Sequence, residues 1–201
     1  YETRDTLGSP HDEDVFDHYG TSQLALVDVA TGAITPIGQP DRYTQVEPAP
    51  DGQHLLISAL RKPYSYVTTY ERFPYDVQVW GLANGAVVKQ QAIASLPLAD
   101  RVPVHGVPMG PRDFTWRQDA PATLYWTEAL DGGDWNAKAP HRDKLMVLSA
   151  PFTGQAKEVL RTEMRFGGLS LSEKKGVALL SEFDENRQWY RTSMVNPDDP
   201  K

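Results

Sequence analysis

The sequence predicts an all-β fold, a partial β-propeller made of four-stranded antiparallel blades. The first observation is a strand, tight turn, strand unit between Val46 and Leu60, in which Pro50-Asp51-Gly52 forms the turn. Proline presets φ, aspartate bonds its own backbone and glycine adopts a positive φ. The second observation is composition, since 16 Pro and 15 Gly in 201 residues suit a turn-rich β protein better than a helical one.

The third observation is that this unit recurs. Phe114–Asp119 leads into Thr123–Thr127, and Leu169–Gly176 leads into Val177–Leu180. A repeat of roughly 40–50 residues is typical of four-stranded propeller blades, with insertions that lengthen individual copies. A β-sandwich with recurring hairpins is the alternative that this pattern leaves open.

The first element is expected within the acidic segment 1–21. Val15, Phe16 and Tyr19 have the spacing of a short amphipathic helix, and Asp12 or Asp14 near its start would suit the helix dipole. A hairpin follows over residues 23–37, with alternating apolar residues and a Thr-Gly turn. It predicts two outer strands of a blade.

Two complete blades and one partial blade should follow. In the first blade, the Asn84-Gly85 turn joins the outer strands. The predicted strands of the first blade are Tyr43–Pro48, Leu55–Ile57, Tyr75–Trp80 and Ala86–Ala92. Those of the second are an inner pair within 114–130, then Lys144–Ser149 and Gln155–Arg161. The last three are Phe166–Leu171, Gly176–Glu182 and Arg187–Val195.

This strand count, two full blades with partial blades at each end, predicts that residues 1–201 are a single fragment of a longer propeller domain. The absence of an initiator Met agrees with that expectation. The net charge of −7 argues against binding nucleic acid through its phosphates. No apolar run is long enough to span a membrane, and without cysteine there can be no disulfide or thiolate metal site.

Two long loops are candidate binding segments. The insertion 61–74 combines the basic residues Arg61, Lys62 and Arg72 with several aromatic rings. Tyr and Arg dominate binding hot spots, which favours a surface facing a ligand or partner. The alternative is that these rings fill the core beneath the loop. The proline-rich connector 95–112 contains His105, a lone loop histidine with no catalytic signature.

Two acidic groups have ligand types suited to a metal ion. They are the run 10–14 (PHDED) and the set Asp131, Asp134, Asn136 and His141. Acidic runs are more often solvated, and no glutamate closes a 12-residue calcium loop after Asp131. We therefore expect no metal and no other cofactor. We also expect no catalytic residue, since Gly-x-Ser-x-Gly and the other catalytic motifs sought are absent.

Four long segments resemble the N-terminal propeller of the prolyl oligopeptidase family of serine peptidases, in its glutamyl endopeptidase-like branch. They begin SPHDEDVFDHYG, EPAPDGQHLLISALRKPYSYV, LPLADRVPVHGVPMGPRDFTW and PHRDKLMVLSAPFTG. The resemblance runs from about residue 6 to 200. It implies a propeller that caps a separate C-terminal α/β-hydrolase domain and restricts access to peptides, in an enzyme that cleaves after glutamate. It also suggests a bacterial periplasmic or secreted location.

The resemblance places the Ser, Asp and His triad outside this chain, so no catalytic residue is carried over. If a glutamate-binding surface lies partly here, Arg61, Lys62 and Arg72 are the predicted contacts because they offer positive charge beside aromatic rings. The expected partners are the hydrolase domain and a peptide, with no nucleic acid or membrane. Exposed edge strands also predict self-association, either between the two chain ends or with a second copy.

Two other functions remain open at this stage. One is a free-standing β-propeller that binds other proteins. The other is a metal-dependent propeller enzyme that uses Asp131, Asp134 or His141.

Overall fold

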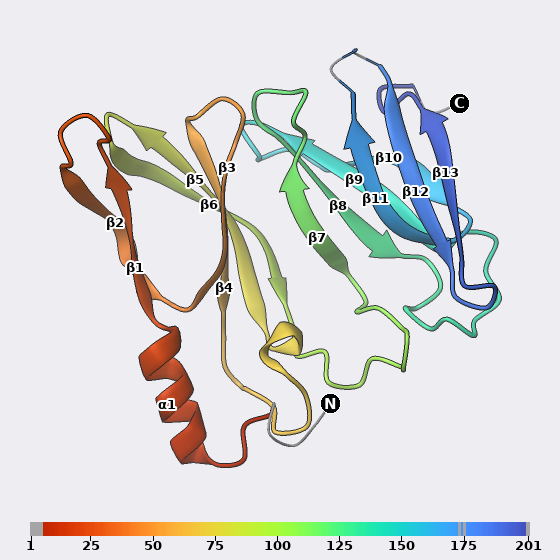
Figure 1. Ribbon diagram of the computed structural model, residues 1–201, viewed down its shortest axis with the longest axis horizontal. Helices are drawn as coiled ribbons and strands as arrows, with labels where there is room; N and C mark the ends of the chain where they lie inside the picture. The colour runs from red at the N-terminus through yellow and green to blue at the C-terminus, as the bar shows by residue number, and fades with distance from the viewer. Residues whose placement is uncertain (1–5, 173, 175, 200–201) are drawn as a thin grey trace. The chain divides into compact units, whose positions relative to one another are not determined.

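The computed structural model describes residues 6–172, 174 and 176–199. They form an almost entirely β structure with four antiparallel sheets and one α-helix (Figure 1). Two sheets have four strands, one has three and one has two. The predicted all-β fold is thus confirmed, and the strand pairing is that of a partial, propeller-like fold. None of the helices in these ranges is long and apolar enough to cross a lipid bilayer.

The chain separates into two compact units. The first comprises residues 1–48 and 52–100, and the second comprises 49–51 and 101–201. The first unit contains one helix, a two-stranded sheet and a four-stranded sheet in the order β3-β4-β5-β6. Its elements are α1 (Pro10–Gly20), β1 (Ser22–Val27), β2 (Ile34–Asp41), β3 (Tyr43–Pro48), β4 (His54–Leu60), a short 3-10 helix (Tyr70–Arg72), β5 (Tyr75–Ala83) and β6 (Ala86–Leu96).

The β1-β2 sheet contacts the four-stranded sheet through a small apolar core. Ile37 of β2 packs with Leu55 and Ile57 of β4 and with Trp80 of β5. β4 is buried along almost its whole length, as expected of a central strand with neighbours on both sides. Burying an aliphatic side chain of this kind contributes about 1.5–3 kcal/mol, so this core holds the hairpin in place.

The predicted N-terminal helix is confirmed as α1. Ser9 caps it, because its hydroxyl accepts a hydrogen bond from the Asp12 backbone N–H, and Pro10 occupies the first turn. Only one of the three predicted apolar residues packs inward. Phe16 contacts the rings of Tyr64 and Phe73, whereas Tyr19 is 82% exposed. Contacts with the loop between β4 and β5 therefore hold the helix.

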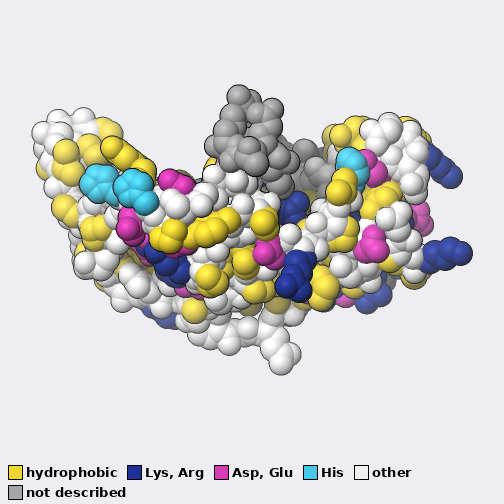
Figure 2. Space-filling view, turned by 90° about the horizontal axis from the view of Figure 1, so that it is seen from below, with side chains coloured by type: hydrophobic (Ala, Val, Ile, Leu, Met, Phe, Trp, Pro, Cys, Tyr) yellow, Lys and Arg dark blue, Asp and Glu magenta, His cyan; other side chains and the backbone are white. Residues whose placement is uncertain are grey.

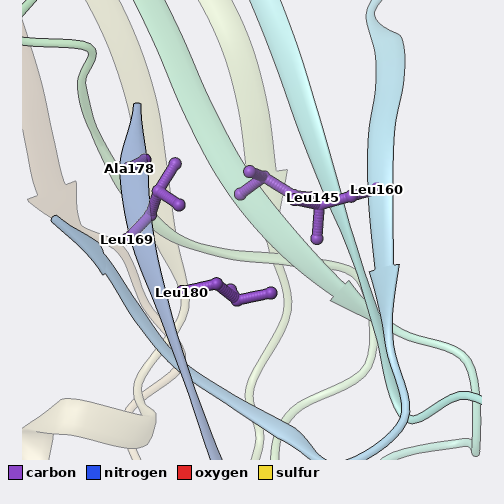
Figure 3. Packing of buried hydrophobic residues seen from close by; sticks show 5 residues of the cluster. All are labelled: Leu145, Leu160, Leu169, Ala178 and Leu180. Carbon is purple, nitrogen blue, oxygen red and sulfur yellow. The ribbon is translucent and has the colours of Figure 1, made fainter. Parts of the chain in front are cut away.

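The second unit contains a four-stranded sheet, in the order β10-β9-β8-β7, and a three-stranded sheet, in the order β11-β12-β13. Their strands are β7 (Pro111–Trp116), β8 (Thr123–Ala129), β9 (Asp143–Ser149), β10 (Lys157–Thr162), β11 (Arg165–Leu171), β12 (Ala178–Asp184) and β13 (Trp189–Val195). Leucines from both sheets meet in one core, in which Leu145 and Leu160 face Leu169 and Leu180 (Figure 3). This core joins the two sheets of the unit.

The predicted strands match the observed ones in number and order, but several ends differ. β6 continues to Leu96, beyond the predicted end at Ala92, because a bulge lets it pair with the start of β5, where Tyr75 faces Leu96. The connector is accordingly shorter, over 97–110. β13 begins at Trp189 because Gln188 has a positive φ of 50° and ends the preceding turn. Residues 173 and 175 of the predicted turn 172–176 lie outside the described residues.

Candidate functional site

The loop between β4 and β5, residues 61–74, is the candidate binding segment of the first unit. Its base is rigid, since Tyr64 and Phe73 are 7% and 2% exposed and stack with ring centroids 4.8 Å apart. Tyr66 and Tyr70 are instead 42% and 50% exposed. The aromatic residues therefore divide between the two predicted roles, with two rings in the core and two at the surface.

Arg61 is held between two carboxylates. Its Nε lies 2.6 Å from Asp76 Oδ2 and its Nη1 lies 2.9 Å from Asp41 Oδ2. Burial opposes its charge, but these hydrogen bonds outweigh burial and raise the pKa of Arg61. Burial likewise acts to raise the pKa of Asp76, and hydrogen bonds from Ser95 and Arg61 lower it instead. The positive charge of Arg61 is neutralised within the first unit.

Lys62 contacts the acidic face of α1. Its Nζ lies 3.0 Å from Asp17 Oδ2 and 3.4 Å from Glu13 Oε2, and the hydrogen bond to Asp17 is the main cause of its raised pKa. Acidic and basic side chains adjoin one another at the left of Figure 2, the side on which Figure 1 places α1. Lys62 therefore helps to hold the helix on the loop.

Two tyrosine hydroxyls complete this contact. Tyr64 donates to Asp17, and Tyr66 donates to Glu13 Oε1 at 2.8 Å. Burial, followed by the bond to Asp17, raises the pKa of Tyr64. Burial acts to raise the pKa of Asp17, but the bonds from Tyr64 and Lys62 lower it overall. The contact between α1 and the loop thus depends on an ionised Asp17.

Arg72 differs from the other two predicted contacts. It is partly exposed at the end of the 3-10 helix Tyr70–Arg72 and forms no ion pair with any residue that the structure describes. Its carbonyl accepts a hydrogen bond from the Ala99 N–H at 2.9 Å, which anchors the loop to the connector. Of the three predicted contacts, Arg72 has the guanidinium that is available to a bound carboxylate.

The second unit contains a buried network of charges that the sequence did not reveal. Asp143, with 0% side-chain exposure, accepts hydrogen bonds from Arg112 Nη2 at 2.7 Å and Arg165 Nη1 at 2.8 Å. The Phe166 N–H donates to its other oxygen at 2.7 Å. Arg112 Nη1 and Arg165 Nε are buried without a hydrogen-bond partner among the described residues. The two guanidiniums therefore offer more buried donors than there are acceptors, and Asp143 is the acceptor that they share.

Asp131, predicted as a possible metal ligand, belongs to the same network. Its Oδ2 accepts from Arg142 at 2.9 Å and from Arg165 at 2.7 Å, and the Gly133 N–H donates to Oδ1 at 3.0 Å. Burial acts to raise the pKa of Asp131, but the bonds from Arg142 and Arg165 lower it. Two guanidiniums in this position disfavour a cation. Across residues 6–172, 174 and 176–199, no group of three His, Asp or Glu side chains could hold a metal ion.

The loops 101–110 and 131–142 pack against each other in the second unit. The Val107 N–H donates to the Gly133 carbonyl at 3.0 Å. Trp135 is 8% exposed, and the Arg142 guanidinium lies over its ring at 4.9 Å from the centroid. His105 Nδ1 lies 3.1 Å from Glu185 Oε1, which gives this histidine a structural contact.

Sequence comparisons connect the chain with peptidases. It is 37% identical over 199 residues to "Probable glutamyl endopeptidase, chloroplastic" of Oryza sativa subsp. japonica, across 97% of this chain and 21% of that protein. It is 38% identical over 193 residues to the Arabidopsis thaliana protein of the same name, across 94% of this chain and 19% of that protein. The chain is thus similar to a segment that makes up about a fifth of these curated relatives.

Two other comparisons add little. No protein-family model matches the sequence. A solved structure of Kuenenia stuttgartiensis Hydrazine Synthase aligns with a TM-score of 0.43 and 12% identity, across 90% of this chain and 61% of that one. That likeness is too slight to carry an argument.

Proposed function

We propose that this chain is a non-catalytic propeller segment of a serine peptidase of the prolyl oligopeptidase family, in its glutamyl endopeptidase-like branch. In this proposal it gates peptide access to a separate α/β-hydrolase domain of the same polypeptide. The observation that carries the proposal is the 37–38% identity, along nearly the whole chain, to proteins named as glutamyl endopeptidases. The two four-stranded antiparallel sheets are compatible with propeller blades.

A division of labour between segments follows from this proposal. The isolated 201-residue chain should not hydrolyse peptides, whereas the full parent polypeptide should do so with sensitivity to serine-directed inhibitors. Unstructured peptides should be cleaved and a folded protein of the same composition should resist. Inhibitor-sensitive turnover by the isolated chain, or equal cleavage of folded and unfolded substrates by the parent, would count against the proposal.

Arg72 is the proposed substrate contact in this segment. Arg61 and Lys62 each contact two carboxylates already, so we assign them to holding the loop. A hydrogen bond to a charged group contributes about 1.5 kcal/mol or more. In the parent enzyme, Arg72→Ala should therefore raise KM for peptides cleaved after Glu by about tenfold and leave kcat nearly unchanged.

Two comparisons make this experiment specific. A matched substrate with Gln in place of Glu should lose much less affinity than the Glu peptide in Arg72→Ala. The control variant Arg187→Ala removes an arginine whose side chain is 72% exposed beside Asp184, and it should leave both KM values unchanged. An equal effect of Arg72→Ala on the Glu and Gln peptides would exclude Arg72 as the glutamate contact.

A further inference from the structure

A hollow of about 170 Å³ lies in the first unit. Residues of β2 and of all four strands of the β3–β6 sheet line it. This volume is many times the roughly 10–15 Å³ that one water molecule needs. Ile57, Ala59 and Trp80 supply its buried apolar surface, with exposures of 2%, 3% and 4%. The hollow is thus large enough for a small polar molecule or for part of a larger one.

The aromatic side of the hollow is rigid. Gly38 of β2 has φ of +64°, and a Cβ added there would lie 2.3 Å from Trp80 Cη2. The backbone of β2 therefore lies directly against the indole ring, and only glycine fits. Tyr43 meets Trp80 edge-on, with the ring centroids 6.0 Å apart. A ligand would find this aromatic side already formed and would not have to order it.

The polar side contains planar groups with paired donors and acceptors. Arg61 lies between Asp41 and Asp76. Gln78 Oε1 accepts the Trp80 indole N–H at 2.8 Å, which leaves the Gln78 NH₂ group as a donor. Two further amides, those of the exposed residues Gln39 and Gln90, also line the hollow. Neither side-chain amide is hydrogen-bonded to any described part of the chain.

The charges select the class of ligand. The charges at the hollow are already paired, since Arg61 contacts both Asp41 and Asp76 and Arg42 also contacts Asp41, so neither an anion nor a cation finds an unpaired opposite charge. A hydroxyl group both donates and accepts, which matches the mixture of amide, carboxylate and guanidinium groups. We propose that the hollow binds a small neutral polyol, in particular the hydroxylated edge of one sugar ring. This proposal is independent of the proposed peptidase function.

The indole N–H resonances of the ¹⁵N-labelled chain provide the test. Trp80 is the reporter, identified by the signal that is lost in Trp80→Phe. Trp126 is a matched internal control, because its indole N–H also bonds a side chain two residues away, Glu128 Oε1 at 2.9 Å, and it does not line the hollow. Glucose, galactose, mannose, N-acetylglucosamine and glycerol are the probes.

A saturable shift of the Trp80 signal by at least one of these probes, with the Trp126 signal unmoved, is the expected result. We expect dissociation constants of about a millimolar, because the hollow is small and partly open. Gln90→Ala, at an exposed position that leaves the core intact, should weaken binding by about tenfold, which equals the loss of one hydrogen bond. Glucuronate should bind more weakly than glucose.

Methyl glycosides and a disaccharide distinguish the source of the ligand. Binding of these compounds as tight as that of the free sugar would indicate the end of a glycan, whereas their exclusion would indicate a free monosaccharide. The absence of a saturable Trp80 shift with every probe overturns the proposal. The proposal is also overturned if neither Gln90→Ala nor Gln39→Ala changes the affinity for the sugar that binds.

Discussion

Arg165 Nη1 lies 2.8 Å from Asp143 Oδ1, and this ion pair joins β11 to β9 within the second unit. Arg112 of β7 donates to the same oxygen at 2.7 Å. Both guanidiniums are nearly buried, with side-chain exposures of 8% and 9%. Charges removed from water are tolerated only while they remain paired, and Asp143 is the carboxylate that both arginines share.

The variant Asp143→Asn should therefore be strongly destabilised. It keeps the size of the side chain and removes the charge that Arg112 and Arg165 share, which leaves Arg165 paired with Asp131 and Arg112 paired only with the exposed carboxylate of Asp113. Breaking a buried ion pair on one side costs about 3–5 kcal/mol, and urea unfolding monitored by near-UV circular dichroism measures that loss. The control is Glu158→Gln, which breaks an exposed ion pair of 2.7 Å with Arg161 and should cost less than about 0.5 kcal/mol. Similar losses of unfolding free energy in Asp143→Asn and Glu158→Gln would refute the role of Asp143 as a buried counter-charge.

The stability of the protein should also depend on the ionisation of Asp131. Its pKa in the folded state is lowered, whereas its unfolded value is about 3.9. For such a group the stabilisation is fully present above the unfolded value and is lost as the pH falls through the folded value. The difference in unfolding free energy between the natural chain and Asp131→Asn should thus be constant near neutrality and shrink below about pH 4.

Urea unfolding at a series of pH values measures this difference. The control, Asp100→Asn, changes an exposed carboxylate that forms no ion pair among the described residues. Its unfolding free energy should follow that of the natural chain at every pH. A stability difference for Asp131→Asn that is the same at acidic and neutral pH would contradict the predicted role of ionised Asp131.

The attachment of α1 should depend on one aromatic side chain. Phe16 lies 5.3 Å from the Tyr64 ring and 5.9 Å from the Phe73 ring, centroid to centroid. Phe16→Ala should remove most of this contact and cost about 2–3 kcal/mol, somewhat less than a fully buried phenylalanine. Amide hydrogen exchange of α1 should accelerate selectively. Tyr19→Ala, on the exposed side of the same helix, should change neither stability nor amide exchange. Equal effects of Phe16→Ala and Tyr19→Ala would show that Phe16 does not hold the helix.

The number, order and pairing of the strands could be predicted because they follow from local signals. Pro50-Asp51-Gly52 and Asn84-Gly85 are turn sequences, and the alternation after them is typical of half-buried strands. The strand ends were less accurate, because they depend on bulges and cross-strand partners. Leu96 belongs to β6 only because Tyr75 lies opposite to pair with it.

The contacts of the charged residues were harder to predict, since a sequence does not show which residues lie beside each charged side chain in the fold. Lys62 and Arg61 looked available to a substrate, but acidic residues from α1, β2 and β5 contact them. Arg112, Asp143 and Arg165 lie in separate strands with no motif in common. Only the fold brings them together, so no spacing in the sequence could have revealed the network.

The close packing of loops 101–110 and 131–142 can be tested with two adjacent glycines. Both have positive φ, +71° at Gly132 and +74° at Gly133, so an alanine at either position is strained by about 1 kcal/mol. A Cβ at Gly133 would also lie 2.0 Å from the Val107 carbonyl oxygen, whereas one at Gly132 would meet nothing within 4 Å. Gly133→Ala should therefore cost about 1–3 kcal/mol more than Gly132→Ala. Exchange of the Val107 amide hydrogen, which bonds the Gly133 carbonyl, should accelerate in Gly133→Ala alone. If Gly132→Ala and Gly133→Ala lose equal stability, and the Val107 amide hydrogen exchanges at the same rate in both, the loops do not pack in this way.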